Sequence, residues 1–301
     1  MGGVSRIKPE TGTVEQWIKP GAFDTRSILG VLVDEKANLL WVCSNDFSSS
    51  GVPGPTSVPG SFVKGFDLTS GEGKVSAALP GKATICNDMV VGPDGSLFVT
   101  NSLTPEILKL KPGTNQLEVW LNSPDFEQPP QGAPGLDGIA FGGDGNLYVN
   151  TFAGGNFFRV DMKDGMPGKI TKLKSSRQLK LPDGLRSTGG LTFVMAEGGG
   201  SADRLTVDGD QVDVETIKDN IAGPTSVAVA GLTLWITGSA SAPLRGVEER
   251  TATPSLPDHR RADAGRQRSR QQREQVGESQ QCYIGYAVGP WARGLFRLLC
   301  A

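Results

Sequence analysis

Histidine is almost absent from this 301-residue sequence: the one histidine, His259, stands in an arginine-rich segment outside the repeated part of the chain. Ser-His-Asp triads, Cys-His pairs and HExxH zinc sites all need an imidazole in the site. The shortage of histidine therefore excludes these classes of catalysis from any site that the repeats build. Chemistry in such a site must use carboxylates, amides, hydroxyls, lysine or a bound metal.

Long apolar runs and a strong net charge are also missing. No apolar run approaches the roughly 18 residues of a membrane-spanning helix, and Met1-Gly2-Gly3-Val4 does not open a signal peptide. The formal charge of -2 at pH 7 gives no electrostatic reason to expect nucleic acid or an anionic membrane as a partner. The sequence therefore predicts neither kind of partner, and it leaves the localisation open.

Cysteine is scarce too. The four cysteines, at positions 43, 86, 282 and 300, show no CxxC spacing. Cys43 and Cys86 stand in strand-like contexts of adjacent repeats, where a cysteine commonly acts as a small core side chain. We predict that these two residues are core residues rather than a disulfide or a metal pair.

Glycine and proline, in contrast, are plentiful, and a repeated hairpin pattern uses many of them. In residues 135–151, GLDGIAFGGDGNLYVNT, two short apolar runs flank a Gly-Asp-Gly-Asn turn, which is a hairpin signal. The pattern returns as CNDMVVGPDGSLFVTNS (86–102), PDGLRSTGGLTFVMAE (182–197), PTSVAVAGLTLWITG (224–238) and, more loosely, LGVLVDEKANLLWVCSN (29–45). Successive second-strand aromatics are 57, 50, 45 and 42 residues apart: Trp41, Phe98, Tyr148, Phe193 and Trp235. A period of about 40 to 50 residues, with several short strands in each unit, is typical of a β-propeller.

The repeats predict one all-β domain over residues 1–238. Residues 3–18 resemble the outer strand pair at 109–120, so the chain begins in the middle of a blade; four fuller blades and a fifth inner hairpin at about 223–237 follow. We predict a six-bladed β-propeller of four-stranded antiparallel blades with incomplete closure. A five-bladed ring, closed by pairing residues 3–18 with 223–237, is the alternative. An unclosed ring exposes strand edges, through which oligomers can form.

After Gly238 the residue usage changes. Residues 239–301 contain ten arginines and no lysine, and residues 260–281 show neither strand alternation nor an apolar helical stripe. We interpret this segment as a disordered tail, resembling translation in a shifted reading frame, rather than as an arginine arm for RNA. Residues 283–301 match no repeat, and they suit either a capping helix or a disordered end.

Polar residues recur where the innermost strands are expected to begin. Five positions before each turn glycine or its equivalent the sequence has Leu29, Asn87, Asp137, Asp183 and Ser226. Innermost propeller strands line the central channel, so Asn87, Asp137 and Asp183 from three adjacent blades should point at one axis. Two carboxylates and an amide oxygen suit a hard divalent cation.

Other polar residues near these positions are expected to face a neighbouring strand, to form turns or to contact substrate only as secondary candidates. Asp88 is expected in a different register, facing a neighbouring strand, while Asp94 and Asp144 are expected only in turns at the opposite rim. Asx-turns are the competing interpretation for every Asp or Asn of this kind. The ends of the second strands return to the same rim as the strand starts, which makes these residues secondary candidates for substrate contact: Asn45, Asp46, Asn101, Thr151 and Glu197.

The segments CNDMVVGPDGSLFVTN, LDGIAFGGDGNLYVN and LPDGLRSTGGLTFVMAEGG resemble the repeats of the senescence-marker-protein/gluconolactonase/luciferin-regenerating-enzyme family of six-bladed propellers, over about residues 3–238. The resemblance implies a metal-dependent lactonase with one divalent cation held by a Glu, an Asn and an Asp. Carried over by motif, Asp137 stands at the Asn position, Asp183 at the Asp position, and Asn87 where the family binds substrate or metal-bound water. The early Glu has no counterpart: Leu29 replaces it if the first blade begins at residue 28, and otherwise it was lost with an earlier blade.

The resemblance also implies a mechanism, in which the metal polarises a lactone carbonyl and a carboxylate takes a proton from water. We expect Asp183 to be both metal ligand and base, Asp137 and Asn87 to complete the metal set, and Asn87, Asn101, Glu197 and Asp46 to contact a lactone or sugar-acid substrate. The expected cofactor is Ca²⁺, Mg²⁺, Mn²⁺ or Zn²⁺, with Ca²⁺ favoured. The alternative function is a non-catalytic propeller that binds or scaffolds, which the missing Glu supports.

Overall fold

The computed structural model describes the side chains of residues 2–8, 11, 13–127, 133–230 and 233–238, and the backbone alone at 247–248, 282–289 and 292–300. This part of the chain is all β, apart from three short 3-10 turns: η1 (Ala22–Asp24), η2 (Ser48–Ser50) and η3 (Pro124–Phe126). None of the helical segments described is long and apolar enough to cross a membrane.

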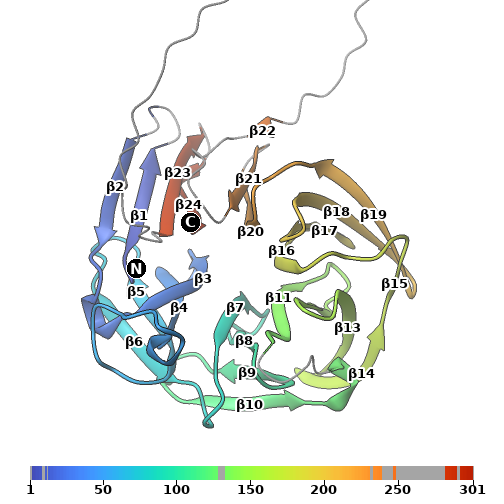
Figure 1. Cartoon of the computed structure of the whole chain (residues 1–301), viewed down its shortest axis with the longest axis horizontal. Helices are drawn as coiled ribbons and strands as arrows, with labels where there is room; N and C mark the ends of the chain where they lie inside the picture. The colour runs from blue at the N-terminus through green and yellow to red at the C-terminus, as the bar shows by residue number, and fades with distance from the viewer. Residues whose placement is uncertain are drawn as a thin grey trace, which may run out of the picture.

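The described strands form six sheets around a central axis (Figure 1). Three sheets have four strands in chain order: β3 (Ser27–Asp34), β4 (Leu39–Asn45), β5 (Ser61–Asp67) and β6 (Gly73–Ala78); β7 (Cys86–Val91), β8 (Leu97–Asn101), β9 (Glu106–Leu110) and β10 (Leu117–Asn122); β11 (Leu136–Phe141), β12 (Leu147–Thr151), β13 (Asn156–Lys163) and β14 (Met166–Lys172). The fourth sheet has five strands: β16 (Pro182–Gly189), β17 (Thr192–Glu197), β18 (Ser201–Asp208), β19 (Gln211–Lys218) and, beside β19, the short β15 (Lys174–Ser175). The fifth sheet has three described strands: β20 (Pro224–Ala230), β21 (Thr233–Gly238) and β22 (Val247–Glu248). In each of these sheets the first long strand lies nearest the axis (Figure 1).

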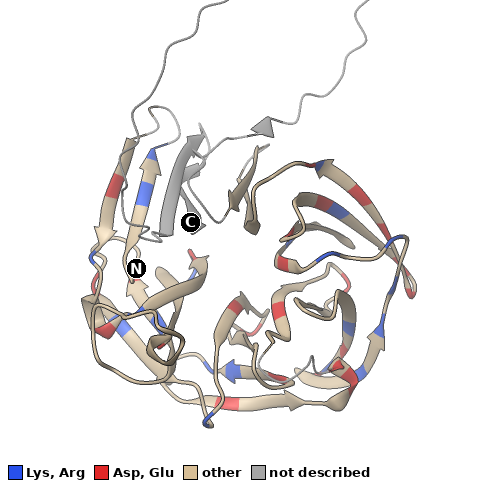
Figure 2. Ribbon diagram, in the orientation of Figure 1, with Lys and Arg blue, Asp and Glu red and all other residues tan. Residues whose placement is uncertain are grey.

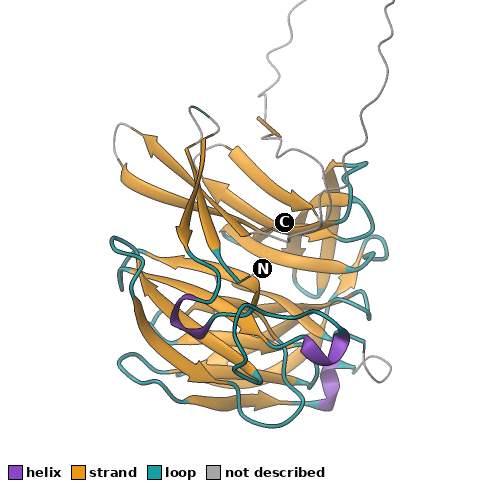
Figure 3. Cartoon of the chain, turned by 60° about the vertical axis from the view of Figure 1, so that its left-hand side comes forward, coloured by secondary structure: helices purple, strands orange, loops and turns teal. Residues whose placement is uncertain are grey.

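The sixth sheet joins the two ends of the chain. It has the order β2-β1-β23-β24 and contains β1 (Val4–Lys8), β2 (Thr13–Ile18), β23 (Cys282–Gly289) and β24 (Ala292–Cys300). The strands β1 and β23 pair in parallel, and β24 contacts both β3 and β20, so this sheet stands between the first and last repeats (Figures 1 and 3). The N-terminal strands therefore do not pair with residues 223–237, as the five-bladed alternative required.

The backbone forms strands at 282–289 and 292–300, where the sequence suited either a capping helix or a disordered end. The sequence there has the composition of a hairpin, because residues 282–288 and 295–299 are rich in aromatic and branched apolar residues and Gly289-Pro290 separates them. A search for the repeat pattern overlooks such a hairpin. His259 and residues 260–281, the arginine-rich part of the predicted tail, lie outside the described residues.

The hairpin turns at the far rim form as the sequence predicts. Gly95 and Gly145 have φ values of 79° and 78°, which favour glycine, and each amide N–H closes a turn on the carbonyl three residues earlier. The Asp144 carboxylate accepts hydrogen bonds from the Asn146 amide at 3.1 Å and from the Tyr148 hydroxyl at 2.9 Å. Asp94 plays the same part for the Ser96 amide. The predicted turn roles of Asp94 and Asp144 are therefore confirmed.

The core lies between adjacent sheets rather than within one layer. Residues of β12 and β13 pack against residues of β16 to β19, and the rings of Tyr148 and Phe193 lie 4.8 Å apart across that interface. Similar buried clusters fill the other interfaces between consecutive described repeats. Strands buried on both faces explain why the second strands, such as Leu147–Thr151, read as continuous apolar runs.

Cys43 and Cys86 form a disulfide, which corrects the prediction that they are free core residues. Both side chains are buried in the interface between the β3–β6 and β7–β10 sheets, and their Cα atoms lie 5.1 Å apart. This separation is within the range that a disulfide spans. The sequence could not show it, because the two residues are 43 positions apart and only the packing of β4 against β7 brings them together.

Candidate metal and substrate site

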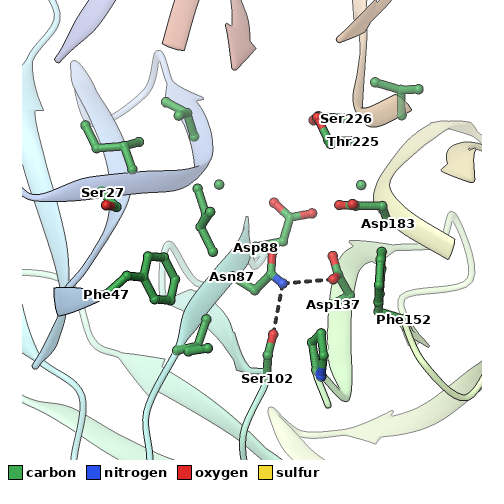
Figure 4. Close-up of a pocket in the computed structure, with 18 of the residues that line it drawn as sticks. Ser27, Phe47, Asn87, Asp88, Ser102, Asp137, Phe152, Asp183, Thr225 and Ser226 are labelled. Carbon is green, nitrogen blue, oxygen red and sulfur yellow. Dashed lines mark hydrogen bonds between the residues drawn. The ribbon is translucent and has the colours of Figure 1, made fainter. Parts of the chain in front are cut away.

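A cavity of about 390 Å³ opens where the innermost strands begin (Figure 4). Its walls come from β3, β7, β11, β16 and β20 and from the loops beside them. Three acidic side chains on the innermost strands, Asp88, Asp137 and Asp183, lie toward the axis, and Figure 2 shows acidic positions on β7, β11 and β16. Asn87 lines the same cavity, so the structure brings together all three residues predicted to form the metal site.

A β-bulge aims these side chains inward. Pairing of the innermost strand with its neighbour is interrupted between Cys86 and Met89 in β7, and at the corresponding point in β11 and β16. Bulges bend a strand and redirect its side chains, and they are frequent next to active sites. The second bulge residue is Gly138 in β11 and Gly184 in β16, where a Cβ atom would collide with the next innermost strand. In each of these Asp-Gly dipeptides, the glycine therefore allows the neighbouring innermost strand to pack closely, and the aspartate lines the cavity.

Asp88 occupies the position that Gly138 and Gly184 hold in the next two sheets, and this corrects its predicted register. Instead of facing a neighbouring strand, its carboxylate lies in the cavity and forms a two-pronged ion pair with Arg186, with N–O distances of 2.6 and 3.0 Å. Arg186 comes from β16, 98 residues later, so the pair crosses the channel. Arg186 could not be predicted from the sequence because it stands at no repeated offset.

Asp137 and Asp183 lie side by side within hydrogen-bonding reach of each other. Asp137 is 3% exposed, and the Asn87 amide donates to its Oδ2 at 2.8 Å (Figure 4). Its Oδ1 is buried and has no donor among the described groups. Two ionised carboxylates cannot donate to one another, so the pair needs a shared proton or a cation.

Burial dominates the electrostatics of this pair. Burial, followed by the charges of Asp183 and Asp88, raises the pKa of Asp137 well above its ordinary value. Burial also raises the pKa of Asp183, to about 7, whereas the charge of Arg186 acts in the opposite direction. Burial alone would lower the pKa of the Arg186 guanidinium. The charge of Asp88 and the other carboxylates has a larger effect, so the pKa of Arg186 is raised. The site therefore favours partners that bring positive charge or a proton.

Second-strand side chains hold the acidic residues in place. Thr100 donates from its hydroxyl to the Asp137 carbonyl at 2.7 Å, and the Asn150 amide donates to the Asp183 carbonyl at the same distance. Ser102 accepts from the Asn87 amide at 2.9 Å (Figure 4). These supports were not predicted, although Thr100 and Asn150 share one position in the repeat. Each ties a second strand to the innermost strand of the next sheet, which fixes the spacing between the cavity residues.

The secondary candidates lie near the same rim but do not line the cavity. Asn45 brackets the backbone of Cys86 with hydrogen bonds of 2.9 Å, and Asn101 accepts from the Ile85 amide at 3.0 Å. Asp46 forms an ion pair with Arg26 at 2.9 Å, and hydrogen bonds from Ser48 lower its pKa. Asp46 thus makes the local turn contact that the Asx-turn interpretation anticipated, through the Ser48 amide, whereas Asn45 and Asn101 bind the backbone at the start of β7.

Glu197 and Thr151 are also engaged in structure. Glu197 is 1% exposed, and it accepts from Arg177 at 2.8 Å and from the Lys180 amide at 2.7 Å. Thr151 is buried and accepts from the Asn156 amide. The cavity is therefore formed by the starts of the innermost strands and not by the ends of the second strands.

The oxygen atoms of Asp137 and Asp183 suit a hard cation, but they are few for a complete set of ligands. Two adjacent carboxylates and one buried oxygen without a donor match the oxygen ligands that Ca²⁺ and Mg²⁺ prefer. Leu29 lines the cavity at the position equivalent to Asn87, so β3 contributes an apolar side chain there and no acidic ligand. No group of three or more His, Cys, Asp or Glu side chains in the described part of the chain is arranged as a complete metal-binding cluster.

Comparison with known proteins shows likeness in fold. No family model and no curated protein matches the sequence. Among solved structures, a gluconolactonase-family protein covers 80% of this chain and 81% of its own, with 18% identity and a TM-score of 0.56. Virginiamycin B lyase from Staphylococcus aureus covers 75% of this chain and 67% of its own, with 17% identity and a TM-score of 0.53.

A third structure, the PQQ-bound aldose sugar dehydrogenase from Streptomyces coelicolor, covers 78% of this chain and 81% of its own, with 16% identity and a TM-score of 0.51. The chain is a β-propeller. Proteins with several different chemistries share this propeller fold, so the fold does not select one activity. The function must be argued from the cavity.

Proposed function

We propose that this propeller hydrolyses lactones or related carboxylic esters in the central cavity, with a divalent cation held by Asp137 and Asp183. The observation that carries the proposal is the buried Asp137 Oδ1, which has no donor among the described residues and belongs to a carboxyl group beside that of Asp183. An anionic oxygen desolvated in this way is costly unless a cation or a proton offsets it.

The residues around the cavity have distinct parts in this proposal. Asp137 and Asp183 would hold the cation, and waters would complete its shell, as is usual when a protein offers few ligands. A divalent cation bound there would polarise the acyl carbonyl of the substrate. Asn87 donates to Asp137 Oδ2, which leaves Oδ1 directed toward the cation position.

Asp183 is the candidate general base, because its carboxyl group lines the cavity beside Asp137 and can reach a water bound there. Asp183 would take a proton from the attacking water as the water oxygen bonds to the acyl carbon. The ring C–O bond then breaks, and the proton passes from Asp183 to the departing alkoxide, which gives the open hydroxy acid.

Arg186 is a positioning residue in the same scheme. Its ion pair with Asp88 fixes a positive charge near the two carboxyl groups. The Asp88 carboxylate is thereby neutralised, which leaves Asp137 and Asp183 as the acidic groups that need an external partner.

Non-catalytic binding is the second candidate function, and Leu29 favours it. This leucine lines the cavity at the position equivalent to Asn87, so β3 offers no third acidic ligand. A propeller with only two acidic ligands could keep the cavity for binding a small molecule without turnover.

A panel of lactones separates the two candidates. Proton release is measured with a pH indicator for wild type and Asp183→Asn, with and without chelator. The hydrolase proposal predicts release that needs a divalent cation and falls by roughly two to four orders of magnitude in Asp183→Asn, as expected for loss of a general base. Asp144→Asn, with its side chain in a far-rim turn, is the matched control and should retain activity. Release that is absent from the wild type, or equal in wild type and Asp183→Asn, contradicts the proposal.

A further inference from the structure

The cavity has a charged floor and an apolar entrance. The floor consists of Asn87, Asp88, Asp137, Asp183 and Arg186 on the innermost strands. The loops that flank those strands supply apolar lining residues, which we call the collar: Phe47, Val52, Ile85, Pro134 and Phe152. Phe47 and Phe152 lie on opposite sides of the Asn87–Asp137 pair in Figure 4.

The collar is held by the backbone. The Val52 amide donates to the Phe47 carbonyl at 3.1 Å, and the Phe152 amide donates to the Gly135 carbonyl at 2.8 Å. The Ile85 carbonyl accepts from the Ser102 amide at 3.0 Å. An apolar entrance fixed in this way is already formed before a ligand arrives, which reduces the entropy cost of binding.

The strands β3 and β20 extend the lining with mainly apolar side chains. Ile28, Leu29 and Val31 of β3 and Val227 and Ala228 of β20 line the cavity, and Ser27, Thr225 and Ser226 of the same strands add three hydroxyl groups. Charged groups on β7, β11 and β16 therefore face a mainly apolar surface on β3 and β20. A ligand that fills the cavity must contact both kinds of surface.

We infer that the cavity takes a lactone or hydroxy acid with an apolar alkyl substituent, and not a polyhydroxylated sugar lactone. This inference rests on the proposed function for the reacting group, which meets the acidic floor. The alkyl substituent would lie against the collar and the apolar strands and lose its contact with water. A sugar lactone would place most of its hydroxyl groups against the apolar side chains of the collar, β3 and β20, where they lose hydrogen bonds to water without replacement. The cavity volume of about 390 Å³ lies in the range usual for small-molecule sites.

A series of lactones that differ only in alkyl length tests the inference by turnover. We expect kcat/KM to rise by roughly tenfold or more from γ-butyrolactone to γ-decalactone, because each methylene buried in an apolar pocket strengthens discrimination. D-glucono-1,5-lactone should react more slowly than γ-decalactone. A rate that is independent of alkyl length, or a preference for the sugar lactone, would leave the hydrolase proposal standing and overturn the inference on ligand class.

Calorimetric binding of the open acids gives a readout independent of turnover. With Ca²⁺ present, so that the proposed cation offsets the acidic floor, we expect 4-hydroxydecanoate to bind at least roughly tenfold more tightly than gluconate. Tight binding of 4-hydroxydecanoate by a protein that hydrolyses no lactone would support the ligand class and contradict the proposed function. No binding of 4-hydroxydecanoate, or tighter binding of gluconate, would overturn the inference.

Substitutions in the collar connect the preference to named residues. Phe47→Ala and Val52→Asp should each weaken 4-hydroxydecanoate binding by roughly tenfold, because they remove or charge part of the apolar entrance. Val119→Asp makes the same chemical change as Val52→Asp at a 46%-exposed position on the outermost strand β10, and it should leave binding unchanged. Equal affinities in the wild type and both collar variants would contradict the assignment of the collar.

Discussion

Asp183 gives the cavity a pH dependence whose sign follows from its raised pKa. Its folded pKa of about 7 exceeds the ordinary 3.8, so the folded protein binds this proton more tightly than the unfolded chain does. The stability that protonated Asp183 contributes is therefore fully present below about pH 4 and is lost as the pH rises through about 7. Without a cation, the ionised pair is a cost to the folded state.

We predict that Asp183→Asn becomes more stable relative to the wild type as the pH rises. In buffer with chelator, the difference in the free energy of unfolding between variant and wild type should grow from pH 5 to pH 8 by up to about 3 kcal/mol, because the folded pKa of about 7 lies about two pH units above pH 5 and one pKa unit corresponds to about 1.4 kcal/mol. Urea unfolding at several pH values measures this difference. A difference that stays constant with pH would show that Asp183 is not the titrating group.

Among the strands, the contact between β4 and β7 determines where Asn87 and Asp88 lie. The Cys43–Cys86 disulfide and the Asn45 side chain both fix Cys86, the residue immediately before Asn87. Two neighbouring sheets are thus joined covalently and by hydrogen bonds at the edge of the cavity. Loosening this junction should affect both stability and the site.

We predict that the Cys43→Ala/Cys86→Ala protein is less stable than the oxidised wild type by about 2 to 4 kcal/mol, the usual contribution of a disulfide. Urea unfolding with and without dithiothreitol provides the measurement. The reductant should destabilise the wild type and leave the double variant unchanged, so the variant serves as its own control. Identical curves for oxidised wild type, reduced wild type and variant would contradict a stabilising disulfide.

The innermost hairpins could be predicted from sequence because their turns and apolar runs are local signals. Residues 135–151 specify both strands and the Gly145 turn, and the equal offset of Asn87, Asp137 and Asp183 predicts that they share one rim. The partners that come from distant residues carry no such signal. Arg186 meets Asp88 across the channel, and Cys43 meets Cys86 between sheets, only after the repeats have packed.

The position of a residue within its repeat also could not show whether its side chain lines the cavity or supports a loop. Asn101 and Glu197 share the rim with Asp137, and their chemistry alone would suit a ligand contact equally well. Their hydrogen bonds to the Ile85 and Lys180 amides depend on the loop conformation, which the repeat pattern does not contain. The bulges at the starts of β7, β11 and β16 are likewise invisible in the pattern, although they direct Asp88 into the cavity.

For the molecule as a whole, the sheet formed by the two ends of the chain links the first and last repeats of the ring. The strand β1 pairs on one edge with β2 and on the other with β23. Removing β23 and β24 would leave that second edge of β1 unpaired and would remove the strand that contacts β3 and β20. Exposed strand edges promote association between chains.

We predict that a chain ending at residue 281 unfolds at a lower temperature than the full chain and associates with increasing concentration. Thermal unfolding and size-exclusion chromatography at several concentrations provide the measurements. The sequence interpretation of residues 239–301 as a disordered tail predicts the opposite, little change in either property. Equal unfolding temperatures and elution volumes would therefore favour the sequence interpretation over a structural role for β23 and β24.

The central claim is that Asp137 and Asp183 together bind a divalent cation in the cavity. Calorimetric titration of Ca²⁺ and of Mn²⁺ into wild type, Asp137→Ala, Asp183→Asn and Asp144→Asn tests it most directly. We predict that the first two variants lose roughly tenfold or more in affinity, because each removes a ligand and a charge that offsets dehydration of the cation. Asp144→Asn should bind like the wild type and lose about 1 kcal/mol or less of stability, as expected for a turn residue. Equal affinities in all four proteins, or no binding by the wild type, would contradict the claim.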